Sequence, residues 1–370
     1  MVYNDIKGAL RQFHFEGRFR DVVEVPTGNI NNTYHLFYDT PDGERQYILQ
    51  QINTFAFKKP EEVMSNIRRV TEHLVRAVTL EGQNPGRRVL RLVSTRGGGF
   101  MYQDEHNRCW RAYDYISGAV TYDRSETAEQ FREVGRAFGR FQRQLTDFPA
   151  YELYETIADF HNTRKRFFYF VDAVGRDPVG RVKYVEDEID FFFDRRKMMA
   201  QAVKMIEDGV LPLRVTHNDT KINNVMMDKS TGEALCVIDL DTVMPGAVLY
   251  DYGDAIRSGA NTSFEDEPDT SKIALDMDMF RAFTQSFVAE VRQSLTEQEI
   301  RLLPLGVKIM TCELAMRFLT DYIEGDVYFK VRSPEHNLIR ARAQMKLLTD
   351  VEAKYDDLCR EVEKLLENGN

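Results

Sequence analysis

The sequence is poor in cysteine and has no long apolar run, and each absence restricts what the protein can be. The 370 residues include only Cys109, Cys236, Cys312 and Cys359, with no Cys-x-x-Cys pair, so a disulfide framework is excluded. The first ten residues lack the apolar core of a signal peptide, and no uncharged apolar stretch approaches the ~20 residues of a membrane span. We therefore expect a soluble, cytoplasmic protein with reduced thiols.

A surplus of positive charge is also missing. Lysine and arginine total 49 against 59 aspartates and glutamates, which gives a formal net charge of −10. Such a chain is a poor partner for nucleic acid or an anionic membrane surface, and we expect neither. The partners that we expect are small molecules, and the chain itself is expected to be a monomer or a weak homodimer.

Apolar residues are plentiful: 43% of the chain is hydrophobic, with 24 phenylalanines, which excludes general disorder. The length exceeds that of one ordinary core, so two domains are expected. The first third is strand-rich, with a hairpin signal at Asp42-Gly43. The strands expected there cover residues 22–25, 33–38, 47–49, 89–93, 100–102 and 109–116, and the helices cover residues 5–15 and 60–78.

The remainder of the chain is mainly helical. Apolar residues recur at steps of three or four from 128 to 145, behind a proposed N-cap at Ser125, and again from 348 to 365. The change of character places a boundary between residues 1–116 and 117–370. The sequence thus predicts an α+β protein with a small antiparallel-sheet N-lobe and a large, mainly helical C-lobe.

The stretch from Val215 to Asp254 contains the residues that carry chemistry. Asp219 and Asn224 precede a strand expected over 225–227, and Asp239 ends a second strand expected over 234–238. Because the strands of a hairpin run antiparallel, the entry of the first lies beside the exit of the second, so these three side chains are expected to converge. Two carboxylates and an amide oxygen suit Mg²⁺, particularly where substrate phosphates complete its coordination.

The pattern His-x-Asp-x-x-x-x-Asn, followed by Ile-Asp at the end of the next strand, resembles the aminoglycoside phosphotransferase-like kinases, relatives of protein kinases. The resemblance implies a protein-kinase-like bilobal fold and ATP as co-substrate. It implies that Asp219 is the base and that Asn224 and Asp239 bind the metal. His217 would hold the loop by hydrogen bonds, and Asp254 would brace it, with Asp251 the second choice for that role.

On the nucleotide side, the loop over residues 26–33 would cover the phosphates, and the stretch 112–118 would be the hinge that meets the adenine edge. The third strand of such kinases carries a phosphate-binding lysine, but this chain has a neutral glutamine in that place. More of the charge neutralisation then falls on Mg²⁺ or on an arginine from elsewhere in the chain. The candidate nucleotide contacts are Gly28, Asn29, Asn31, Thr33, Gln50 and Tyr115.

Over almost its full length the chain looks like the bacterial N-acetylhexosamine 1-kinases, on the stretches 47–50, 213–221, 238–246 and 316–329. This resemblance implies transfer to the anomeric hydroxyl of N-acetylglucosamine or N-acetylgalactosamine, giving the α-1-phosphate. The Gln in place of lysine is part of the resemblance. The candidate acceptor-binding residues are Arg317, Asp321, Tyr328 and Asp241, and Arg257 could also line the pocket.

Two other hypotheses remain open. A kinase for a cationic acceptor, such as an aminoglycoside or choline, could use the acidic residues between 313 and 326, although Arg317 among them argues against it. A pseudokinase that binds nucleotide without turnover would be consistent with Gln50. Neither composition nor spacing decides between these and the sugar kinase.

Overall fold

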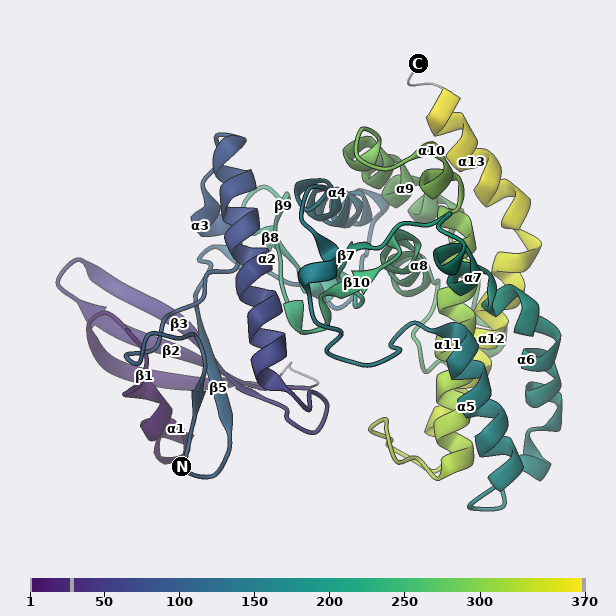
Figure 1. The fold of residues 1–370 in the computed structure, drawn as a ribbon, viewed down its shortest axis with the longest axis horizontal. Helices are drawn as coiled ribbons and strands as arrows, with labels where there is room; N and C mark the ends of the chain where they lie inside the picture. Colours follow the sequence, from purple (N-terminus) through teal and green to yellow (C-terminus); the bar gives the residue numbers. More distant parts are fainter. Residues whose placement is uncertain (1, 27–29, 368–370) are drawn as a thin grey trace. The chain divides into compact units, whose positions relative to one another are not determined.

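The computed structural model describes residues 2–26 and 30–367, with side chains of the first helix described from Ile6 onward (Figure 1). The chain forms two compact units. The first unit comprises the residues up to Val120 together with Tyr151–Ile157 and Met226–Met244, and the second comprises Thr121–Ala150, Ala158–Val225 and Pro245–Asn370. The first change of unit lies close to the boundary predicted at 116–117, whereas the return of two later segments to the first unit was not predicted.

The first unit is built on an antiparallel sheet in the order β1-β2-β3-β5-β4. The hairpin turn predicted at Asp42-Gly43 is confirmed, and Gly43 adopts a φ of 120° that favours glycine. The strand predicted over 89–93 is wrong, because only a single bridge from Leu92 to Tyr113 forms there. The strands are β1 (Arg18–Val25), β2 (Asn32–Thr40), β3 (Gly43–Ile52), β4 (Tyr102–Gln103) and β5 (Cys109–Asp114).

Alternating side chains of β2 explain why this sheet has a core on one face. Leu36 is fully buried and its neighbours Tyr34 and Tyr38 are nearly so, and all three pack with Phe13 and Trp110. Helix α1 (Val2–Leu10) contributes to the same core.

Helix α2 (Pro60–Leu80) starts with proline at its first turn, where no hydrogen-bond donor is needed, and buries a stripe from Val63 to Val78. A short helix α3 (Pro85–Arg88) follows.

A second sheet of three strands has the order β6-β8-β9, from β6 (Ala119–Val120), β8 (Val225–Asp228) and β9 (Ala234–Val237). Its turn is closed by Asp228, whose N–H donates to Glu233 O and whose carbonyl accepts from Gly232 N. The predicted hairpin is therefore confirmed. A 3₁₀ turn over Leu240–Thr242 follows β9 after two intervening residues.

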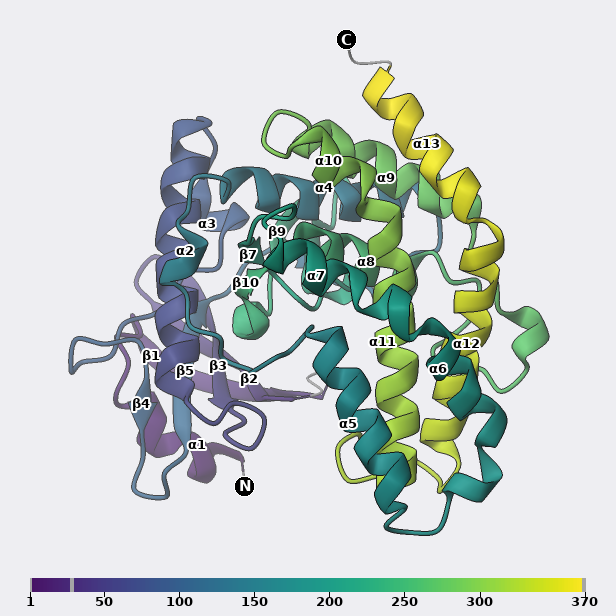
Figure 2. The same cartoon turned by 45° about the vertical axis from the view of Figure 1, so that its right-hand side comes forward.

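The second unit is mainly helical, and Figure 2 shows α5, α11 and α12 side by side. Thr127, not Ser125, caps α4, because its hydroxyl accepts from Gln130 N. The helix predicted over 348–365 is interrupted at Lys354, which separates α12 from α13. The main helices are α4 (Ala128–Gln144), α5 (Thr163–Arg176), α6 (Glu186–Met199), α7 (Gln201–Glu207), α8 (Val248–Gly259), α9 (Met277–Val291), α10 (Glu297–Arg301), α11 (Leu303–Glu324), α12 (His336–Ala353) and α13 (Tyr355–Glu367).

Helix α8 is held against α11 at very short range, and two glycines permit this. A Cβ on Gly253 would lie 2.2 Å from Gly306 O, and one on Gly306 would lie 2.0 Å from Leu249 O. Any larger residue would push the helices apart, so this contact determines where α8 presents its acidic residues. None of the helices in the part of the chain that the structure describes is long and apolar enough to cross a membrane.

Candidate active site

The loop from His217 to Asn224 follows the short strand β7 (Arg214–Thr216) in the second unit, and Asp251 on α8 holds its first turn. Both carboxylate oxygens of Asp251 are used: Oδ1 accepts from Asn218 N at 2.7 Å, and Oδ2 accepts from His217 N at 2.8 Å. Gln142 on α4 also donates to Oδ2, at 2.7 Å. Asn218 sits at a φ of 63°, so these bonds stabilise a backbone that few residues adopt readily.

Asp254, one turn further along α8, holds the next part of the same loop. Its Oδ2 accepts from Thr220 N at 3.0 Å, and its Oδ1 accepts from Arg257 Nη2 at 2.7 Å. Asp254 is the residue that the resemblance to kinases favours as the brace of this loop, ahead of Asp251. In the structure both residues bond the loop backbone, and Asp251 makes more of those bonds. Arg257 is buried against Asp254 and Glu265.

His217 is fully buried, and its ring lies against the edges of two phenylalanines of α4. The ring centroids are 5.6 Å from Phe138 and 5.9 Å from Phe141. Its Nδ1 accepts from Asp219 N at 3.3 Å. A buried ring that accepts a backbone bond within the loop is the geometry expected of the structural role predicted for His217.

Asp219 and Asn224 are adjacent in the second unit. Asn224 Nδ2 donates to Asp219 O at 2.8 Å and to Asp219 Oδ2 at 3.1 Å. Lys221, which the sequence analysis did not single out, lies with its Nζ 2.7 Å from Asp219 Oδ1. Burial alone would raise the pKa of Asp219, but the charge and hydrogen bond of Lys221, with smaller effects from His217 and Asn224, lower it below its ordinary value. Asp219 is therefore an ionised carboxylate at neutral pH.

The Lys221–Asp219 pair gives a testable pH dependence. A carboxylate with a lowered pKa stays ionised until the pH falls through that lowered value. In the predicted role of base, Asp219 would therefore give an acid limb of kcat/KM below the ordinary aspartate range. We expect Lys221→Met to move this limb to higher pH, because the main stabilising charge is gone. The matched control is Lys204→Met, which removes an exposed lysine from its pair with Asp208. Superimposable profiles for Lys221→Met and the unaltered protein would show that Lys221 does not act on the titrating base.

In the first unit, Asp241 is the centre of a buried polar cluster. It is 3% exposed, and its Oδ2 accepts from Asn31 Nδ2 at 2.7 Å. Its Oδ1 forms an ion pair with Arg111 Nη1. Arg111 Nε donates to Gln50 Oε1 at 2.9 Å, and Gln50 Nε2 donates to Thr33 Oγ1 at 3.0 Å. Four sequence candidates are thus brought together, and Arg111 joins them as a residue that the sequence analysis missed.

The remaining metal and nucleotide candidates are Asp239, Gly28, Asn29 and Tyr115. Asp239 follows β9 at a φ of 58° in the first unit, whereas Asp219 and Asn224 belong to the second, so the convergence of the three stays a prediction. Gly28 and Asn29 lie outside the described residues. Tyr115 stacks on His35 with ring centroids 4.3 Å apart, and its N–H donates to Gln46 O, so its backbone donor is already used.

The donor atoms of the second-unit pair fit a magnesium site. Because Asn224 Nδ2 is used by Asp219, its amide oxygen is the atom left for a cation, and carboxylate and amide oxygens are the ligands that Mg²⁺ takes. Within the described ranges, no group of three or more His, Cys, Asp and Glu side chains is placed to hold a metal unaided. A site of this kind has few protein ligands and needs substrate phosphates to complete it.

Arg317, on α11, faces aromatic rings rather than an acidic partner. Its guanidinium carbon lies 5.5 Å from the Phe160 centroid, 5.7 Å from Tyr328 and 5.5 Å from Phe329. Among the residues that the structure describes, no group accepts a hydrogen bond from Arg317. A planar cation over aromatic faces, with its donors unused, is suited to bind a polar ligand.

Asp321, one turn beyond Arg317 on α11, is buried and turned toward its own chain. Its Oδ1 accepts from Val327 N and Tyr328 N at 2.9 and 2.7 Å, and its Oδ2 accepts from Phe329 N and Asn337 Nδ2 at 2.9 and 2.8 Å. The three backbone bonds fix the loop that carries Tyr328, and the fourth joins Asp321 to Asn337 on α12.

A buried His–Glu pair lies one turn before Arg317 and was not predicted. Glu313 accepts from His161 Nδ1, with its two oxygens at 3.0 and 3.2 Å, and the two side chains are 2% and 7% exposed. Burial would raise the pKa of Glu313, but His161, Arg317 and Arg166 together lower it. The partners are 152 positions apart in the sequence, so no local signal could have revealed this pair.

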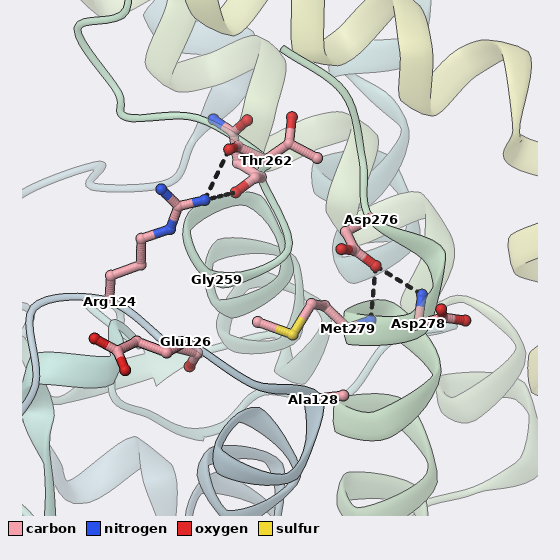
Figure 3. Close-up of a pocket in the computed structure, with 10 residues that line it drawn as sticks. Arg124, Glu126, Ala128, Gly259, Thr262, Asp276, Asp278 and Met279 are labelled. Atoms are coloured by element: carbon pink, nitrogen blue, oxygen red, sulfur yellow. Dashed lines mark hydrogen bonds between the residues drawn. The ribbon is translucent and has the colours of Figure 1, made fainter. Parts of the chain in front are cut away.

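The second unit also has a pocket of about 210 Å³, at the start of α4 and α9 and the end of α8 (Figure 3). Arg124 Nη2 donates to Thr262 O at 2.7 Å on one side, and Asp276 caps α9 through Asp278 N and Met279 N on the other. None of the predicted site residues lines this pocket.

The chain combines a small antiparallel-sheet unit with a larger, mainly helical unit that carries the His217–Asn224 loop, which is the architecture of kinase-like phosphotransferases. The chain belongs to the phosphotransferase enzyme family (APH), whose family model matches residues 21–280.

Solved structures support the fold across nearly the whole chain. Spectinomycin phosphotransferase, solved with ADP and spectinomycin, is 11% identical, with a TM-score of 0.57 and coverage of 96% of this chain and 97% of that one. An aminoglycoside phosphotransferase from Alicyclobacillus acidocaldarius is 12% identical, with a TM-score of 0.59 and coverage of 95% and 94%. A choline/ethanolamine kinase family protein from Mesorhizobium loti is 13% identical, with a TM-score of 0.58 and coverage of 98% and 100%. At these identities the likeness is one of fold.

Proposed function

We propose that the protein transfers the γ-phosphoryl group of ATP to the anomeric hydroxyl of an N-acetylhexosamine. Its membership of the phosphotransferase family supports the reaction type, and the resemblance in the sequence supports the acceptor. Each acidic side chain near Arg317 already has a partner within the chain. This observation supports the choice of a neutral acceptor.

Asp219 is the base in this proposal. The carboxylate accepts the proton of the anomeric hydroxyl, whose oxygen forms the new bond to the γ-phosphorus as the bond to the β–γ bridging oxygen breaks. ADP leaves with that electron pair. An anomeric hydroxyl is more acidic than an ordinary alcohol, so a carboxylate with a lowered pKa is a sufficient base.

Asn224 and Asp239 would hold Mg²⁺, with Asn224 contributing the amide oxygen that Asp219 leaves unused. The ion, when bound, neutralises charge on the phosphates of the nucleotide. Asp251 and Asp254 keep the loop of Asp219 in one conformation, so little reorganisation is needed for the reaction.

A cationic acceptor would need carboxylates that face it without partners. Glu313 is bonded to His161, and Asp321 accepts four hydrogen bonds from its own chain. Glu324 pairs with Arg176, and Asp326 pairs with Arg181 and Asn337. These are the acidic residues that the aminoglycoside or choline hypothesis invoked. With all of them engaged by ion pairs or hydrogen bonds within the chain and two arginines beside Glu313, the region favours a neutral, hydroxyl-bearing ligand.

Arg317 and Tyr328 are the acceptor contacts that we propose, with Asp321 shaping the loop behind them. We expect Arg317→Gln to raise the KM for N-acetylglucosamine by about 10- to 100-fold, the value of one or two hydrogen bonds to a charged group. The KM for ATP should change far less. Arg332→Gln, at a residue whose side chain is 84% exposed, is the matched control. Equal rises in both Michaelis constants would argue against an acceptor role for Arg317.

A panel of acceptors tests the substrate class directly. ADP release is measured with N-acetylglucosamine, N-acetylgalactosamine, glucose, kanamycin and choline, each with ATP and Mg²⁺. The proposal requires turnover with an N-acetylhexosamine. Turnover with kanamycin or choline but with neither N-acetylhexosamine would reject it in favour of a cationic acceptor, and ATP binding without any turnover would favour a pseudokinase.

A further inference from the structure

Arg111 lies where the phosphate-binding lysine of related kinases would be expected to reach. Strands β3 and β5 pair in antiparallel register, with Gln50 opposite Arg111. Opposed residues of such a pair project from the same face of a sheet, and here Arg111 Nε donates to Gln50 Oε1 at 2.9 Å. The guanidinium therefore lies at the end of the Gln50 side chain, near the place that the ammonium of a lysine at position 50 would occupy.

Arg111 is a charged side chain inside an otherwise buried strand. It is 1% exposed, between Trp110 and Ala112, which are also buried. Burial alone would lower the pKa of Arg111, but Asp241, Tyr113 and Asp239 raise it, so the guanidinium is charged. Buried ion pairs add little stability compared with well-packed apolar residues. A contribution to stability alone therefore explains poorly why this buried strand contains an arginine.

In the part of the chain that the structure describes, Arg111 has two hydrogen-bond partners, of which Gln50 is a predicted nucleotide contact and Asp241 a predicted acceptor contact. Asp241, which pairs with it, comes two residues after the metal-site candidate Asp239, and the other oxygen of Asp241 holds Asn31 from the predicted phosphate loop. A guanidinium has five N–H donors. Within the described residues, only Gln50 and Asp241 accept from Arg111, through Nε and Nη1. The other donors are left for an anionic ligand, and a guanidinium is well matched to phosphate oxygens.

We infer that Arg111 supplies the phosphate-binding cation that Gln50 cannot, and that Gln50 and Asp241 hold its guanidinium in position. The cation has moved from the third strand to the neighbouring one while keeping its place on the sheet face. This inference rests on the proposed use of ATP and specifies how the first unit binds its phosphates.

Calorimetric binding of ADP with Mg²⁺ tests this, because it needs no acceptor and no turnover. We expect Arg111→Gln to raise the Kd for ADP by about 10- to 100-fold, the effect of losing a charge-assisted bond. Returning the cation to β3 in the double variant Gln50→Lys/Arg111→Gln should restore most of the lost affinity. The matched control is Arg108→Gln, which breaks the Arg108–Asp104 pair in the loop between β4 and β5 and should leave ADP binding unchanged.

The double variant, which moves the positive charge from residue 111 to residue 50, distinguishes phosphate binding by Arg111 from a purely structural role. If Arg111 only supports the fold, moving the cation to residue 50 will not restore nucleotide affinity. The inference is overturned if a folded Arg111→Gln protein binds ADP as tightly as the unaltered protein, or if the folded double variant stays as weak as the single one. If Arg111→Gln does not fold, the double variant decides alone: affinity near that of the unaltered protein supports the inference, and loss of binding overturns it. An unaltered protein that binds no ADP would instead reject the proposed function.

Discussion

Replacement of Asp219 by asparagine is expected to lower kcat by about 10²- to 10⁴-fold, the usual contribution of a general base. The change keeps the size of the side chain, and the loop is held mainly through backbone groups that Asp251 and Asp254 accept. The fold and the affinity for ADP should therefore survive. Steady-state kinetics with N-acetylglucosamine and ATP, together with ADP calorimetry, measure the two effects separately.

The control for this variant is Asp208→Asn, the same chemical change in a half-exposed residue paired with Lys204. It should leave kcat unchanged. Near-normal turnover by Asp219→Asn would remove Asp219 as the base. A loss of kcat accompanied by a lost thermal transition would mean that the substitution damaged the fold, and the kinetics of Asp219→Glu would then decide the question by testing the same carboxylate at a longer reach.

The second large effect is expected at Asp239. Asp239→Asn should lower kcat/KM by at least about 10²-fold, as expected when a group that stabilises transition-state charge is removed. It should also raise the Mg²⁺ concentration needed for half-maximal rate. Asparagine is the appropriate substitution because Asp239 has a φ of 58°, a left-handed conformation that asparagine tolerates and alanine does not. Activity is measured across a Mg²⁺ titration at fixed ATP.

Asp21→Asn, at an exposed position of β1, is the matched control in the same unit and should leave the Mg²⁺ titration unchanged. An Asp239→Asn protein whose half-maximal Mg²⁺ concentration equals that of the unaltered protein would count against Asp239 as a metal ligand. Lower activity without any change in Mg²⁺ dependence would assign Asp239 a role in shaping the loop that Asp241 also occupies.

Local patterns in the sequence were sufficient to predict much of the fold. The hairpin at Asp42-Gly43 and helix α2 are encoded by neighbouring residues, through a turn that needs glycine and an apolar stripe with helical spacing. The strand expected over 89–93 failed because its apolar residues are buried without a continuous ladder: only Leu92 bridges to Tyr113. Apolar runs predict burial more reliably than they predict hydrogen bonding.

In the candidate site, too, contacts within one loop could be predicted from the sequence, whereas contacts between distant segments could not. Asn224 and Asp219 are neighbours within one loop, so their spacing predicted that they act together, and the structure brings them into hydrogen-bond contact. Arg111 could not be found this way, because its place opposite Gln50 depends on the register of strands 61 residues apart. Asp254, which the sequence favoured as the brace of the loop, does bond the loop backbone, and Asp251 bonds it as well. Both lie on one face of α8, and spacing alone cannot show that both reach the loop.

Phosphorus NMR of the reaction with N-acetylglucosamine, ATP and Mg²⁺ shows in one spectrum whether the phosphoryl group is transferred, to which position of the sugar, and to which anomer. We expect consumption of the ATP signals, appearance of ADP, and a new sugar phosphate resonance coupled to an α-anomeric proton. Unchanged ATP in the presence of folded protein, or a phosphate attached to any other hydroxyl of the sugar, would contradict the proposed function.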